Sequence, residues 1–336
     1  MSTFAALERS TVQLVEAKRF AAHGDPSYSR LALLLLDNAA ELSLLRTARS
    51  ALLLADQYAE MGGRLDEAGL GGLSESLQAT IRLGNVSARR RKKIEREFDA
   101  LVDFVAERGR TELAPEVADC LKILHRFRNG AYHREDIRAD IIHSAVLIYF
   151  FLCCELLADE RHPAHQLGTP GPVIAAILGD LDPAKSRSGF AYDTMELRTL
   201  IAARLRQDLS LDHAAVTRAL SQHLNGRLSV LDRRLETITD FFERPPRRST
   251  VLRIIQFGPD SAADPLPADF WTRKLQVTEA TLEDWQSSAH RIAEAAHAHD
   301  GLRSFARIES VLAQFEEQVE PFIEEIDRQE ELWRER

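Results

Sequence analysis

The sequence has few of the residues that stabilise small extracellular proteins or anchor a chain in a membrane. Its 336 residues include three cysteines, Cys120, Cys153 and Cys154, which are too few for a disulfide framework. We expect reduced thiols, with Cys153 and Cys154 as small core residues in an apolar run. No secretory signal pattern opens the sequence, and no apolar run approaches the roughly 20 residues of a membrane helix. These absences predict a cytoplasmic protein without membrane contact.

Patterns for metal ions and nucleotides are also missing. His290, His297 and His299 lie in an alanine-rich helical pattern without a nearby cysteine, so we predict no metal site. The glycine-rich stretch 62–72 lacks the lysine and the preceding strand of a phosphate-binding loop. The sequence therefore predicts no metal and no organic cofactor.

Apolar residues recur with the helical period through most of the chain, which predicts an all-α fold. A Pro and Gly stretch follows His162, so we divide the chain into a helical bundle at 1–162 and a second helical region at 163–336. One helix, 28–61, is apolar on almost every face and is expected to be buried. The remaining long helices are predicted at 2–22, 87–109, 114–128, 134–159, 212–242 and at the C-terminal end.

The second region contains one strand candidate, TVLRIIQF at 250–257. The last helix carries apolar residues at heptad spacing, which bury one seam against a partner helix: Phe305, Ile308, Leu312, Phe315, Val319, Phe322 and Ile326. Packing against helix 212–242 of the same chain is expected, rather than an intermolecular coiled coil. Pro321 is expected to kink or break this helix.

The stretch LHRFRNGAYHRED, residues 124–136, contains the most informative motif. Asn129 and Gly130 favour left-handed backbone and helix ends. We therefore predict that one helix closes at Arg128 and the next opens at His133, with both side chains facing one cleft. On an uninterrupted helix, positions five residues apart would lie about 140° apart around the axis.

This arrangement resembles the HEPN (higher eukaryotes and prokaryotes nucleotide-binding) family of helical domains, whose motif is an arginine, a polar residue and, a few positions later, a histidine. Arg128, Asn129 and His133 match it, and LALLLLDNAAELSLL and LKILHRFRN resemble its flanking helices over roughly 27–160. The resemblance implies a metal-independent endoribonuclease that pairs as a homodimer, so that two motifs line one cleft. It also implies a toxin–antitoxin or antiviral defence context, with an antitoxin or defence-system protein as a further partner.

The residue types suit RNA cleavage that leaves a 2′,3′-cyclic phosphate. Histidine, with an ordinary pKa of about 6.5, can take or give a proton near neutral pH, and His133 is assigned this role. Arg128 can hold two phosphate oxygens, while Asn129 orients the phosphate or the imidazole. Tyr132, beside His133, is counted as a supporting residue.

Two further features are weaker. Asp37 and Glu41 share one face of helix 28–61. They either point at Arg128 or His133, or they form a structural salt bridge or occupy a rim position. The window 82–138 holds 14 basic and 10 acidic residues, although the chain as a whole has a net charge of −9. A basic run in this window is a candidate RNA-binding segment or a solvated charged face: Arg89, Arg90, Arg91, Lys92, Lys93 and Arg96.

Three other interpretations stay open. Arg128 can pair with Glu135 or Asp136 at a helix end, with His133 as a capping residue and no catalysis. The bundle can be a non-catalytic module that binds RNA, a nucleotide or a protein. Residues 200–224 loosely match a helix-turn-helix, but the second helix is expected to run on to Phe242, and its exposed face is not notably basic for a DNA-binding regulator.

Overall fold

The computed structural model describes residues 3–67, 75, 78, 81, 84, 86–108, 113–133, 137–160, 165–167, 171–179, 191–258 and 265–334. The all-α fold is confirmed: within these residues the only strands are β1 (His165–Leu167) and β2 (Ala191–Asp193), which form one short antiparallel pair. The chain divides into two compact units, Met1–Asp212 and His213–Arg336.

The division falls 50 residues later than the boundary after His162 that the sequence suggested (212 − 162 = 50). The reason is α9 (Thr194–Asp208), which packs against α7 (Ala139–Asp159). Arg198 of α9 donates to the Glu160 carbonyl at 2.6 Å, and Arg206 bonds the Glu155 carboxylate at 2.5 Å. These long-range contacts join the segment after the Pro and Gly stretch to the first unit.

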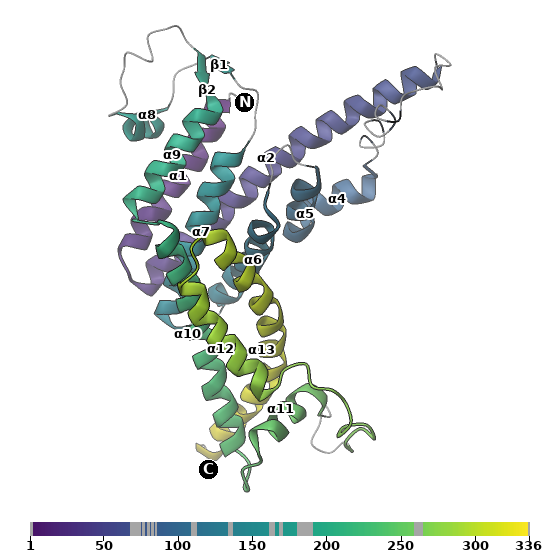
Figure 1. Cartoon of the computed structure of the whole chain (residues 1–336), viewed down its shortest axis with the longest axis vertical. Helices are drawn as coiled ribbons and strands as arrows, with labels where there is room; N and C mark the ends of the chain where they lie inside the picture. Colours follow the sequence, from purple (N-terminus) through teal and green to yellow (C-terminus); the bar gives the residue numbers. More distant parts are fainter. Residues whose placement is uncertain are drawn as a thin grey trace. The chain divides into compact units, whose positions relative to one another are not determined.

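The first unit is a bundle built around α2 and α7, which are in contact and have the same chain direction, with α2 oblique to α7 in the view of Figure 1. Helix α2 spans Pro26–Glu67. Besides α7, α9 and the two short strands, the described elements of this unit are α1 (Thr3–Ala22), α4 (Ala88–Arg96), α5 (Phe98–Arg108), α6 (Pro115–His133) and α8 (Pro172–Leu178). By length and composition α7 could cross a membrane, but 78% of its most apolar window is buried inside the protein. It is the core helix of this bundle.

Helix α2 is longer and less buried than the sequence suggested. It continues through Gly62 and Gly63, which were expected in a loop. One face carries small residues such as Ala32 and Ala40, which are buried against the neighbouring helices. The opposite face is open to solvent, with Leu31 45% and Leu53 65% exposed. The expectation of a fully buried helix was therefore wrong for this outer face.

The predicted single helix at 87–109 is two helices. Ser87 caps α4 by accepting a hydrogen bond from the Arg90 amide at 3.2 Å. Glu97 then adopts an extended conformation (φ −117°) and separates α4 from α5. Because α5 begins at Phe98, the break places an aromatic ring at the start of a new helix, where it packs toward α6.

The second unit contains α10 (His213–Asp240), α11 (Arg248–Phe257), α12 (Glu279–Ala293) and α13 (Ala298–Arg334). The predicted strand at 250–257 was wrong, because this segment forms α11 and buries Val251, Leu252 and Ile255 on one helical face. The predicted packing of the last helix against helix 212–242 is confirmed, and α13 runs through Pro321 without a break.

Helices α10 and α13 are parallel. The Ala298 amide donates to His213 at 3.5 Å, and farther along Arg234 bonds Glu320 at 2.7 Å. Between these contacts Arg227, whose side chain is only 11% exposed, bonds both Glu309 and Glu316. Burial and the two carboxylates act in opposite directions on this guanidinium, and the carboxylates raise the pKa of Arg227 above its ordinary value.

Candidate functional site

The helix break predicted at Asn129 and Gly130 was wrong. Helix α6 is continuous from Pro115 to His133, and Gly130 does not have a positive φ. Arg30 of α2 donates from Nε to the Ala131 carbonyl at 3.3 Å, which satisfies one acceptor in the last turn. Positions 128 and 133 therefore lie about 140° apart around one helix.

Asp37 is the centre of a polar cluster that joins three helices. Its carboxylate is fully buried and accepts from the guanidinium of Arg128. It also bonds Nδ1 of His125 at 2.7 Å and accepts from the Tyr149 hydroxyl at 2.7 Å. A buried carboxylate is tolerated only when it is paired and hydrogen-bonded in this way. Asp37 thus points at Arg128, as one of the two sequence interpretations expected.

Arg128 is partly accessible, with 24% of its side chain exposed. Besides Asp37, it donates to Oδ1 of the exposed neighbour Asn129 at 2.6 Å. Its Nε is buried and has no hydrogen-bond partner within the described residues. A buried donor without a partner costs about 1–3 kcal/mol, and such groups are rare enough in native proteins to require an explanation.

His125 lies one turn before Arg128 on α6. Its ring stacks on Phe98 of α5, with ring centroids 4.0 Å apart and an angle of 4° between the planes. Burial lowers the pKa of His125, while the carboxylates of Glu41 and Asp99 act in the opposite direction. Glu41, predicted as a supporting residue, is therefore close enough to influence this histidine.

Several predicted residues lie outside the described part of the chain. The backbone of Tyr132 and His133 belongs to the last turn of α6, but their side chains are not described. Residues 134–136, including the alternative partners Glu135 and Asp136, are not described either. The roles expected for these side chains stay predictions.

The structure separates the basic run into residues that form ion pairs with other described residues and residues that do not. Arg90 bonds Glu107 of α5, and Arg91 bonds Asp56 of α2 at 2.5 Å. Lys93 pairs weakly with Glu97 at 3.5 Å. The exposed residues Arg89, Lys92 and Arg96 follow i, i+3, i+7 spacing and have no ion pair among the described residues.

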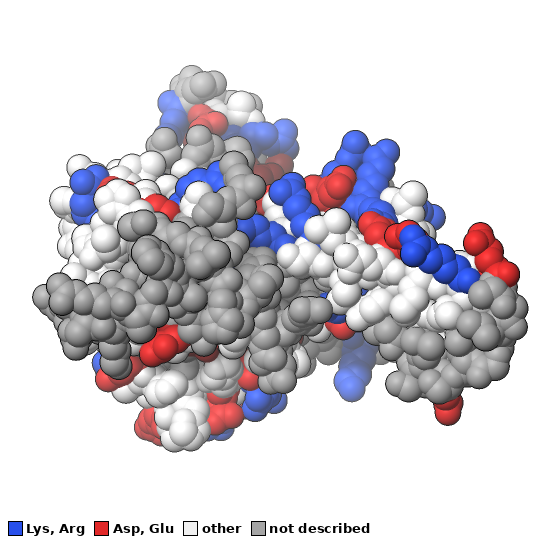
Figure 2. Space-filling view, turned by 90° about the horizontal axis from the view of Figure 1, so that it is seen from above, with Lys and Arg blue, Asp and Glu red and all other residues white. Residues whose placement is uncertain are grey.

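This second group defines the α4 basic stripe: Arg89, Lys92 and Arg96. In Figure 2 basic side chains are interleaved with acidic ones on the visible face rather than forming one broad field. The stripe is correspondingly narrow, since Glu95 and Glu97 flank it on the helix. A narrow row of cations suits one strand of a polyanion better than a flat anionic surface.

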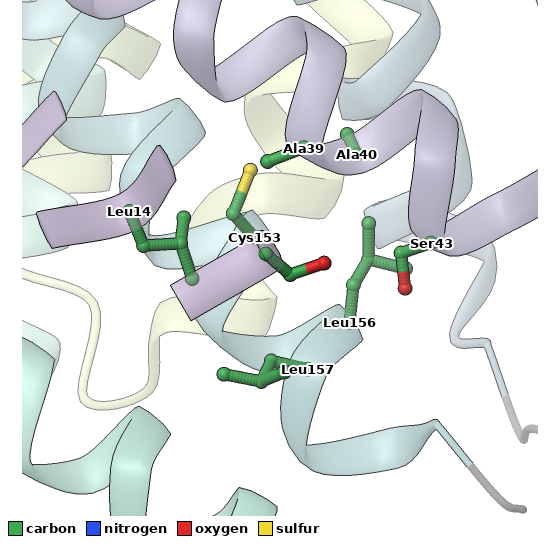
Figure 3. Close-up of a pocket in the computed structure, with 8 residues that line it drawn as sticks. Leu14, Ala39, Ala40, Ser43, Cys153, Leu156 and Leu157 are labelled. Atoms are coloured by element: carbon green, nitrogen blue, oxygen red, sulfur yellow. The ribbon is translucent and has the colours of Figure 1, made fainter. Parts of the chain in front are cut away.

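A cavity between α1, α2 and α7 is too small for a substrate. Its volume is about 10 Å³, and Ser43 of α2 and Cys153 of α7 face it together with leucine side chains (Figure 3). Such a space holds at most one water molecule. Burial raises the pKa of Cys153, which makes this thiol unreactive.

Sequence reasoning missed two members of the Asp37 cluster. His125 stands three residues before Arg128 in HRFRN, so helical spacing alone could have placed both on one side of α6. Tyr149 lies in the apolar run YFFLCC, 112 residues after Asp37, and no local pattern reveals its hydrogen bond. Burial raises the pKa of this tyrosine, so it donates as a neutral phenol.

Neither a protein-family model, nor a curated protein, nor a solved structure matches this chain.

Proposed function

We propose that the chain is a metal-independent endoribonuclease of the HEPN type. In this proposal Arg128 binds the scissile phosphate, Asn129 helps to orient the arginine, and His133 transfers a proton. The reaction joins the 2′ oxygen to phosphorus and releases the 5′ oxygen, leaving a 2′,3′-cyclic phosphate. Histidine and arginine can perform these steps without a metal ion.

The observation that carries the proposal is the contact between buried Asp37 and partly exposed Arg128. An arginine held by a buried carboxylate loses less conformational entropy when it binds phosphate. The Asn129 contact restricts the same guanidinium further. Two hydrogen bonds leave several of its five N–H groups free to donate.

The α4 basic stripe supports an RNA substrate. Arg89 and Arg96 are seven residues apart, or about 10.5 Å along the helix axis. A nucleic-acid strand carries a phosphate every ~3.4 Å of duplex axis, so the stripe spans about three phosphate steps. In the proposal these cations hold RNA outside the cleavage site.

The proposal includes a homodimer through the HEPN-like unit, a cytoplasmic location and a toxin–antitoxin or antiviral defence context, all from the family resemblance. Positions 128 and 133 lie far apart around α6. A homodimer overcomes this separation, because the second protomer can bring its own Arg128 to His133 motif to the same cleft. Mixing Arg128→Ala protein with His133→Ala protein should then restore part of the cleavage that each variant lacks.

A non-catalytic RNA-binding or protein-binding module is the second candidate. The contacts of Arg128 with Asp37 and Asn129 also favour this candidate, because a purely structural ion pair would make the same contacts. In that case Arg128 stabilises α6 against α2, and RNA affinity without cleavage is the expected behaviour.

The test is cleavage of total tRNA and of a long single-stranded RNA by the full chain in EDTA. Arg128→Ala and His133→Ala should abolish cleavage while helicity and oligomeric state stay unchanged. Arg126→Ala, on the exposed face of the same helix, and His290→Ala, exposed on α12, are matched controls that should retain activity. Wild-type protein that binds these RNAs without cutting them would establish the binding module instead.

A further inference from the structure

The continuity of α6 changes which residues share a face with Arg128. Residues three apart on a helix are neighbours, separated by about 60° around the axis. Position 125 is therefore on the Arg128 side of α6, whereas position 133 is about 140° away. Within one chain, the histidine beside the arginine is His125.

One carboxylate connects the two side chains. Oδ2 of Asp37 bonds Arg128, and Oδ1 lies 2.7 Å from Nδ1 of His125. The Tyr149 hydroxyl donates to the same Oδ1 atom at 2.7 Å. Because an ionised carboxylate only accepts, it selects the tautomer of His125 that carries its proton on Nδ1. The lone pair is then on Nε2.

The Nε2 atom of this ring is not used in the contact with Asp37. The His125 side chain is 20% exposed, and Nε2 makes no hydrogen bond with any residue that the structure describes. The Phe98 ring covers one face of the imidazole and fixes its plane. A carboxylate at Nδ1 and an open Nε2 form the arrangement of a general base.

The charged surroundings come from every helix packed on His125. Asp37 and Glu41 approach from α2, Asp99 from α5, and Arg126 and Arg128 lie on α6 itself. Burial outweighs the carboxylates and lowers the pKa of His125. The imidazole is therefore neutral at pH 7, the form that can accept a proton.

We propose that His125 is the general base of the RNA cleavage, with Asp37 as the residue that positions both His125 and Arg128. This inference rests on the proposed endoribonuclease function and adds a proton-transfer residue that lies outside the Arg128 to His133 motif. The second proton transfer stays with His133, which in the proposed homodimer comes from the second protomer.

The step balances as follows for a substrate phosphate bound at Arg128. The 2′-hydroxyl gives its proton to Nε2 of His125 as the 2′ oxygen forms a bond to phosphorus. The bond from phosphorus to the 5′ oxygen breaks, and that oxygen takes a proton from His133 of the second protomer. Afterwards His125 releases its extra proton to water, and His133 regains one from water.

The competing explanation is that His125 only packs α5 and α6 against α2. His125→Asn separates the two roles, because the asparagine amide can still donate to Asp37 in place of Nδ1–H but cannot act as a base. A structural role predicts retained cleavage in this variant. The proposed role predicts a loss of about 100-fold or more, the usual contribution of acid–base catalysis.

The decisive experiment measures single-turnover cleavage of a fluorescent single-stranded RNA from pH 5 to pH 9. The proteins are wild type, His125→Asn, His125→Ala with and without added imidazole, His133→Ala, and His290→Ala as control. RNA binding is measured in parallel with a non-cleavable analogue that carries a 2′-deoxy group at the cleavage site.

We expect His125→Asn to bind RNA as wild type does, to lose cleavage, and to lose the acidic limb of the pH profile. We expect imidazole to restore part of the cleavage by His125→Ala. If His125→Asn cuts as wild type does while His133→Ala is inactive, the His125 inference is overturned and the endoribonuclease proposal stands. If wild type binds the analogue but never cuts RNA, the proposed function fails, and the His125 inference fails with it.

Discussion

Replacing the buried carboxylate of Asp37 is the most informative perturbation of stability. In Asp37→Asn the side chain keeps one acceptor for His125 and Tyr149, but an amide NH₂ or a neutral oxygen replaces the anion that pairs with Arg128. Because Asp37 is fully buried, water cannot replace the lost interaction. Breaking a buried ion pair from one side costs about 3–5 kcal/mol.

The aromatic residues make it possible to assign this loss to one unit. All three tryptophans, Trp271, Trp285 and Trp333, belong to the second unit, whereas all five tyrosines are in the first. With an m value of about 2.5 kcal/mol/M, Asp37→Asn should lower the urea midpoint of the first unit by more than about 1 M. Far-UV circular dichroism detects this change, while the tryptophan fluorescence transition stays in place.

Two further variants control the interpretation. Asp56→Asn removes an exposed carboxylate from the same helix and should cost less than about 1 kcal/mol. Asp37→Leu combined with Arg128→Met removes both charges, so it should cost at least about 2 kcal/mol less than the sum of the single changes. A loss below about 1 kcal/mol for Asp37→Asn, or additive costs, would refute the assignment of Asp37 as a buried ion-pair centre.

Three other perturbations have defined outcomes. Changing the three residues of the α4 basic stripe to glutamine should make the slope of log K against log salt for single-stranded RNA shallower by about 2, because each cation contributes ~0.7. An anisotropy titration measures this slope. Changing Arg218, Arg233 and Arg307 together to glutamine is the matched control and should leave the slope unaltered. Arg227→Met should lower the tryptophan-detected stability of the second unit by about 3–5 kcal/mol, and an unchanged midpoint would contradict this. Burial lowers the pKa of His125 and His143, so their contribution to stability is present above pH ~6.5 and is lost as the pH falls. The first unit should therefore unfold at a lower urea concentration at pH 5 than at pH 7.5. His143→Asn should reduce this difference between the two urea midpoints.

Local pattern predicted most of the helices, because burial of one helical face leaves a periodic signal in the sequence. Helices α1, α2, α7 and α10 appear close to their predicted ranges. The strand expected at 250–257 was wrong because β-branched residues indicate strand propensity, whereas Val251 and Ile255 are also spaced for a helix. Tertiary burial decided between the two.

The candidate site was only partly predictable, since it depends on contacts between distant residues. The pair Asn129 and Gly130 favours a helix end locally, but α6 continues and Arg30 bonds a carbonyl in its last turn. The sequence offered Asp37 as a carboxylate that faces Arg128 or His133, beside the alternatives of a structural salt bridge and a rim position. It gave no sign that His125 shares this carboxylate, because that depends on the register between α2 and α6.

The buried arginine between α10 and α13 has a consequence for how the second unit folds. A heptad seam looks the same after a shift of seven residues, so leucine, valine and phenylalanine alone do not fix one alignment. Glu309 and Glu316 are themselves seven residues apart, and both bond Arg227. After such a slip Arg227 would meet Glu316 and Ile323, and one of its two ion pairs would be lost. Misaligned pairings are thereby penalised, and a single helix alignment is selected.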